Sequence, residues 1–153
     1  MSMTNLARAI LWGGLLCGTL DAIAATVSFF FQGVSPVRLW QGVASGLLGT
    51  KSFQYGWKSS SLGLLLHYCI ALSAATVFCV LAQNLPQVLL HFALAGIVYG
   101  LLVFLVMNLI VVPLSARPKR PYTLVGVVSQ LIIHVLFVGL PIAVTAHGFL
   151  VTN

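Results

Sequence analysis

The residues best placed to do chemistry are polar side chains inside long apolar stretches. Asp21 is the only acidic residue of the chain, and it lies near the middle of a mostly apolar run from Ala9 to Phe31. A carboxylate at the centre of a membrane costs about 2.5–3.5 kcal/mol on insertion scales, so we expect Asp21 to face protein rather than lipid. Five residues form the candidate site: Asp21, His67, Asn108, Gln130 and His134.

Depth along the helices predicts which of these residues meet. Asp21 lies 12 residues after Ala9, and His134 lies 12 residues after Tyr122, where the last apolar run begins. With a rise of about 1.5 Å per residue, both fall near the middle of the bilayer. The sequence therefore predicts contact between Asp21 and His134.

The other three candidates extend this pair into a polar seam. Gln130 lies one turn before His134, while His67 and Asn108 are each about five residues from the expected cytoplasmic ends of their spans. Such a seam has two interpretations. Membrane bundles use polar side chains to join helices, and transporters use them to line the path of an ion or ligand.

Catalysis and cofactor binding have little support in the residues. The chain lacks an H-E-x-x-H helix and a G-x-S-x-G elbow, and its single acid excludes a mechanism with two carboxyl groups. His67 and His134 are expected to differ in depth by about seven residues, roughly 10 Å, which argues against a shared haem iron. We therefore expect no enzymatic activity, no metal and no cofactor.

The composition indicates an all-α, polytopic membrane protein. Hydrophobic residues make up 60% of the 153, charged residues 5%, and the mean hydropathy is +1.11. The net charge of +6 comes from scattered residues rather than a dense basic patch, so nucleic acid is not an expected partner. The chain is expected to form one domain, a four-helix transmembrane bundle with predicted spans at residues 9–31, 62–82, 90–113 and 122–146.

Small residues predict how the spans pack. Gly14 and Gly18 lie on one stripe of the first span, near Asp21, where a neighbouring helix can approach closely. The short turn at residues 83–87 predicts that the second and third spans form a tight antiparallel hairpin. The facing sides would be marked by Gly63, His67, Ala71 and Ala74 on one helix, and by Ala93, Gly96 and Gly100 on the other.

One short amphipathic helix is expected between the first two spans, at residues 36–48. Ser35 and Pro36 form a typical helix start, and an apolar side that includes Trp40 and Leu47 opposes a side that holds Arg38. The sequence predicts that this helix lies in the headgroup region with its apolar side in the bilayer. A re-entrant half-helix, encouraged by the glycines of the segment, is the alternative.

Basic residues predict the orientation and the lipid partner. Six of the seven lie in two loops, which the positive-inside rule places in the cytoplasm with both termini outside. These residues are expected to contact anionic lipid headgroups: Arg38, Lys51, Lys58, Arg117, Lys119 and Arg120.

A resemblance to a known family covers roughly the middle third of the chain. Its motifs are Gly63-Leu64-Leu65-Leu66-His67, Pro86, the run from Ala95 to Gly100, and Pro113-Leu114, ending near Pro118. These residues resemble the YagU-like family of small bacterial inner-membrane proteins. The resemblance implies a location in the bacterial inner membrane and no established activity.

The sequence thus predicts an accessory or structural membrane protein that self-associates or joins a membrane complex. The alternative is a small transporter or ligand-binding membrane protein that uses the polar seam around Asp21 and His134.

Overall fold

The computed structural model describes residues 3–119, 121 and 123–151, and the regular structure in those ranges is entirely helical. Four helical segments of this part of the chain are long and apolar enough to cross a membrane. The all-α fold with four candidate spans is therefore confirmed. The spans are α1 (Met3–Phe30), α3 (Gly56–Asn84), the run of α5 (Phe92–Val106), η2 (Met107–Val111) and α6 (Val112–Leu114), and the run of α7 (Leu124–Ile133), η3 (His134–Gly139) and α8 (Leu140–Leu150).

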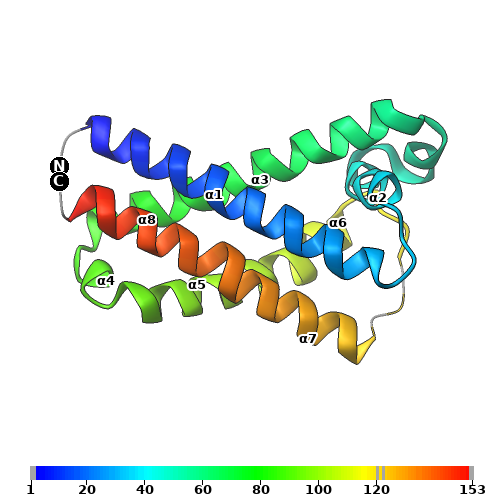
Figure 1. The fold of residues 1–153 in the computed structure, drawn as a ribbon. Helices are drawn as coiled ribbons and strands as arrows, with labels where there is room; N and C mark the ends of the chain where they lie inside the picture. The colour runs from blue at the N-terminus through cyan, green and yellow to red at the C-terminus, as the bar shows by residue number, and fades with distance from the viewer. Residues whose placement is uncertain (1–2, 120, 122, 152–153) are drawn as a thin grey trace.

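The helices form an elongated bundle with different features at its two ends (Figure 1). The start of α1 and the end of α8 lie at one end, together with the short helix α4 (Gln87–Leu90). The other end carries α2 (Pro36–Leu48), the 3-10 segment η1 (Gly49–Gln54) and the loop after α6. The described basic residues of the two loops are thus gathered at the end opposite the termini.

The expected hairpin of the second and third spans is wrong. α1 packs along α3 and α8, and α5 packs along η3 and α8, whereas α3 and α5 share no comparable interface. The small residues explain this choice, because Gly96 and Gly100 meet Gly139 and the backbone of His134 on the fourth span. α5 reaches α3 through a side chain instead, since the Tyr99 hydroxyl donates to the carbonyl oxygen of Ala74 at 2.7 Å.

Two spans contain a π-helical segment just before a proline. η2 ends two residues before Pro113, and η3 ends two residues before Pro141. A proline inside a helix has no N–H to donate and its ring collides with the carbonyl four residues earlier. The preceding turn therefore widens, and in the fourth span the widened turn begins at His134.

The short helix α2 begins as the sequence predicts and has the predicted bounds. The Ser35 hydroxyl accepts a hydrogen bond from the Arg38 N–H, and Pro36 occupies the first turn. In Figure 1 α2 is seen nearly end-on while the spans run across the view, so it crosses the end of the bundle. This placement favours a surface helix over a re-entrant one.

The side of α2 that packs on the rest of the protein is distinct from the apolar side that is expected to face the bilayer. Its fully buried residues are Gln41, Ala44 and Ser45, whereas Leu47 is exposed. Gln41 is accommodated because its side-chain nitrogen donates to the Gly56 carbonyl at 3.1 Å, and Ser45 donates to the Gly42 carbonyl at 2.7 Å. Polar side chains with partners can be buried at little cost, which the helical wheel does not take into account.

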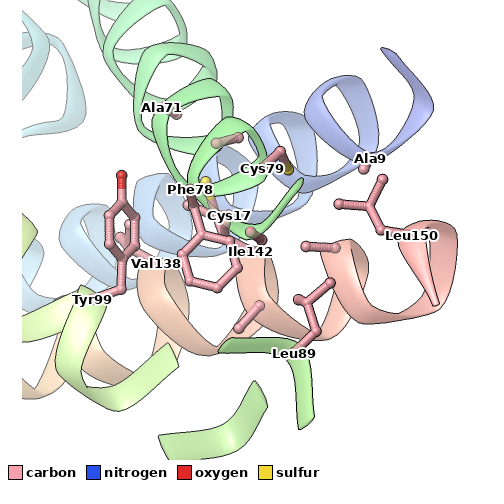
Figure 2. Close-up of a cluster of buried hydrophobic side chains, with 14 residues drawn as sticks. Ala9, Cys17, Ala71, Phe78, Cys79, Leu89, Tyr99, Val138, Ile142 and Leu150 are labelled. Carbon is pink, nitrogen blue, oxygen red and sulfur yellow. The ribbon is translucent and has the colours of Figure 1, made fainter. Parts of the chain in front are cut away.

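A tightly packed core lies between α1, α3 and the fourth span, toward the end that holds the termini. Figure 2 shows the ring of Phe78 among Cys17, Ile142 and Tyr99. Phe78 and Tyr99 meet edge to face with ring centroids 5.0 Å apart. Large apolar side chains elsewhere on the spans are exposed, as helices that face lipid require.

α3 begins at Gly56, six residues before the predicted start of the second span. Lys58 therefore lies in the first turn of this helix rather than in a loop. The earlier start also moves His67 to the interior of the helix, 11 residues after Gly56. That shift decides the composition of the candidate site.

Candidate functional site

Asp21 on α1 is paired with His67 on α3. The carboxylate oxygen Oδ2 of Asp21 lies 3.8 Å from Nδ1 of His67, and their side chains are 17% and 14% exposed. This separation is that of an ion pair rather than a short hydrogen bond. The single acid of the chain is thus sheltered by protein, as the sequence predicts, but by a different histidine.

His67 is fixed by a second link to α1. Its Nε2 lies 2.8 Å from the carbonyl oxygen of Gly18, one turn before Asp21. A carbonyl oxygen can only accept, so Nε2 carries the hydrogen, and Nδ1 of a neutral ring is left to face Asp21 without one.

Aromatic rings hold the imidazole on both sides. Trp40 of α2 meets His67 edge to face at 5.2 Å between ring centroids, and Tyr68 meets it at 5.5 Å. Tyr68 itself shares a hydrogen bond of 3.0 Å with the hydroxyl of Thr19 on α1. Three elements, α1, α2 and α3, thus converge on one imidazole.

His134 occupies a second position near the carboxyl group without pairing with it. It interacts electrostatically with Asp21, as His67 does. Its Nδ1 lies 2.8 Å from the carbonyl oxygen of Gln130, and its ring meets Phe104 edge to face at 5.7 Å. The ion-pair distance to Asp21 therefore belongs to His67 rather than to His134, whose predicted interaction with Asp21 is present as the larger electrostatic effect of the two.

The reason for the correction is helix length. The prediction put His67 about seven residues from the depth of His134 because it began the second span at residue 62. The extra turns of α3 bring His67 level with Gly18 and Asp21. Sequence hydropathy missed these turns because residues 56–61 are polar or aromatic.

The remaining two candidates do not join the Asp21 site. Asn108 donates to the Phe104 carbonyl of its own helix at 2.9 Å. Gln130 contributes its backbone carbonyl to His134, and the polar contacts described for the Asp21 carboxyl involve the two histidines. The site is a compact acid–imidazole cluster rather than a continuous seam.

The predicted lipid-contacting residues divide into two groups. Lys51, Lys58 and Lys119 are exposed at the end opposite the termini. Arg38 and Arg117 are exposed as well, and they also line a cavity of about 190 Å³ at that end. Arg120 lies outside the described residues.

Two cavities of the protein lie outside the Asp21–His67 pair. One is the arginine-lined cavity, and the other is an open groove of about 260 Å³ beside Thr19 and Tyr68. Neither is lined by Asp21, His67 or His134. Within the part of the chain that the structure describes, no three histidine, cysteine or acidic side chains are grouped to hold a metal ion.

Three contributors to the cluster were not among the sequence candidates: Gly18, Trp40 and Tyr68. Gly18 could have been found, because it lies three residues before Asp21 on the same stripe of small residues. The sequence predicts that Trp40 lies at the membrane surface, and nothing in its local pattern predicts a contact with His67.

In the described part of the chain, these features define an all-α bundle with four helices long and apolar enough to cross a membrane and an acid–imidazole pair inside it. Comparison of the chain with family models, curated proteins and solved structures gives no match.

Proposed function

We propose that the chain is an accessory or structural membrane protein, and that the Asp21 cluster joins its helices. The observation that carries this proposal is the pair of links from His67 to α1, one to the Asp21 carboxyl and one to the Gly18 carbonyl. Both links connect α1 to α3, and the same imidazole supports α2 through Trp40. A polar residue that closes an interface in this way acts as a helix-joining group.

The surroundings of the cluster support this proposal over a transport path. A path needs space that leads to the ionisable group, and neither of the two cavities is lined by Asp21, His67 or His134. His67 and His134 each use one ring nitrogen on a backbone carbonyl, which holds both rings in place. Asn108 likewise bonds within its own helix instead of facing a shared channel.

The second candidate is a proton or cation path through Asp21. One observation favours it, namely that two imidazoles interact with the same carboxyl group. Acid and histidine side chains in that arrangement recur in the proton relays of membrane pumps and transporters.

Proteoliposomes distinguish the two candidates. A pH gradient across vesicles that contain the purified protein is expected to decay at the rate of protein-free vesicles, and Asp21→Asn should not alter that rate. The readout is a pH-sensitive dye trapped inside the vesicles. A faster decay that Asp21→Asn abolishes would contradict the structural role and favour the proton path.

We further propose that the protein resides in a bacterial inner membrane as a relative of the YagU-like family, with α2 and the loop after α6 in the cytoplasm. The support is the gathering of basic residues at one end of the bundle, which the positive-inside rule assigns to the cytoplasmic side. Partners in this setting are anionic lipids and, for an accessory protein, a second copy or another membrane protein.

Cysteine labelling tests the orientation. Ser59 lies in the loop that the sequence predicts between the first two spans, but it is unsuitable for labelling. Its side chain is buried and donates to the Ser52 carbonyl. Thr50→Cys and Gln87→Cys replace exposed residues at opposite ends of the bundle, in a background where the exposed Cys69 is changed to alanine. An impermeant maleimide added to intact cells is expected to label position 87 and not position 50. The reverse pattern would overturn the proposed orientation.

A further inference from the structure

The arginine-lined cavity lies at the end of the bundle opposite the termini, beside the surface helix α2. It has a volume of about 190 Å³. α2 contributes Arg38, Gly42 and Ser45, η1 contributes Phe53, and the loop after α6 contributes Arg117. Segments far apart in the sequence therefore build one small site that two arginines line.

Both arginines are held by local structure. The Arg38 guanidinium lies over the Phe53 ring, 4.0 Å from its centroid. The loop that carries Arg117 is fixed to α2, because the Ala116 N–H donates to the Gly46 carbonyl at 2.9 Å. The Arg117 N–H also donates to the Ser115 hydroxyl at 3.3 Å. The cavity is thus formed by docking this loop onto the surface helix.

The two arginines give the lining of the cavity a positive charge. Asp21 is the only acid in the sequence, and it is paired with His67 inside the bundle. Guanidinium groups bind phosphate oxygens through paired N–H donors, a geometry that lysine does not offer. Two arginines around one small cavity therefore favour a phosphate-bearing ligand.

The position of the cavity identifies the source of the phosphate. Phe29 near the end of α1 and residues of the surface helix α2 border it, so it lies where the first span meets the headgroup layer. Phe29, Val34 and Leu39 supply an apolar side next to the guanidinium groups. We propose that this cavity binds the headgroup phosphate of an anionic phospholipid, with the acyl chains lying against the apolar surface of the bundle.

The affinity of lipid for the purified protein tests this proposal. Protein in a neutral detergent is titrated with phosphatidylglycerol or with phosphatidylcholine, and bound lipid is counted by native mass spectrometry. The wild-type protein is expected to retain phosphatidylglycerol in preference to phosphatidylcholine. Arg38→Gln and Arg117→Gln should each weaken phosphatidylglycerol binding about tenfold, because each removes one charge-assisted contact.

A steric variant separates the cavity from its charge. Gly42 lines the cavity, and a Cβ atom added there meets no atom within 4 Å. Gly42→Leu therefore fills the site while keeping both arginines, and it too should weaken phosphatidylglycerol binding about tenfold. Lys119→Gln is the matched control, since it removes an exposed charge at the same end without altering the cavity lining. This control should bind phosphatidylglycerol as the wild type does.

Three outcomes would overturn the proposal. Equal loss of binding in Lys119→Gln and the two arginine variants would indicate a general attraction to positive charge. Unchanged binding in Gly42→Leu would place the lipid outside the cavity. Binding of inorganic phosphate by a protein that retains no phosphatidylglycerol would identify a soluble phosphate ligand instead. Thermal unfolding of each variant verifies that lost binding is not lost folding.

Discussion

Replacing His67 with alanine is expected to lower the free energy of unfolding in detergent by about 3 kcal/mol, because it strands a buried acid and removes a packed ring. The imidazole supplies two polar links from α3 to the Asp21 region of α1, beside the hydrogen bond between Tyr68 and Thr19. It also supports Trp40, so α2 is expected to loosen from the end of the bundle. Titration with a denaturing detergent, followed by circular dichroism and Trp fluorescence, measures both effects.

His91→Ala is the control for this variant. His91 lies between α4 and α5 near the end that holds the termini, and its side chain is exposed. Its removal should change the free energy of unfolding by less than about 0.5 kcal/mol. A His67→Ala protein as stable as His91→Ala would contradict the joining role of His67.

Replacing Gly139 with alanine is expected to destabilise the bundle by about 3 kcal/mol, the upper end for an overpacked site. A Cβ atom at this position collides with the Gly96 carbonyl oxygen and with the backbone of Gly100. Backbone atoms cannot rotate away as a flexible side chain can, so α5 must separate from the fourth span. The free energy of unfolding in the same detergent titration measures the loss.

Gly148→Ala is the matched control on the same span. A Cβ atom at Gly148 meets nothing within 4 Å, and alanine favours a helix over glycine by about 1 kcal/mol or less. This variant should be as stable as the wild type or slightly more stable. Equal losses in the two variants would show that the close approach of α5 at Gly139 is not maintained in detergent.

The spans and the surface helix could be predicted because their signals are local. Long apolar runs indicated four spans, and Ser35 with Pro36 indicated the start of α2. The π segments were also predictable in principle, since each precedes a proline whose missing N–H alters the preceding turn.

The pairing of the helices could not be predicted from the same signals. A short connection joins α3 to α5, but α5 packs most closely on the helix whose small residues lie opposite its own. Gly96 and Gly100 find that partner in Gly139, whose position on a separate span gives no signal in the local sequence.

The need of Asp21 for a partner inside the protein could be predicted, but the identity of that partner could not. A lone acid in an apolar run needs a partner inside the protein, and the sequence predicts His134 at the depth of Asp21 and His67 roughly 10 Å away from that depth. The choice between His67 and His134 depended on where α3 begins, which hydropathy places too late. The depth of His67 in the bilayer was counted from the predicted start of the second span, so the error in that start became an error in the depth.

A double-mutant cycle between Asp21 and His67 tests the central claim that this pair joins α1 and α3. Asp21→Leu and His67→Phe are each expected to destabilise the protein, because each leaves a polar partner unsatisfied. The double variant removes both polar groups, so its loss should fall short of the sum of the single losses by about 1.5 kcal/mol or more. The same cycle with His134→Phe should show a smaller coupling, since His134 bonds to the Gln130 carbonyl of its own helix. Additive losses for Asp21 and His67, or a larger coupling between Asp21 and His134, would contradict the pairing described above.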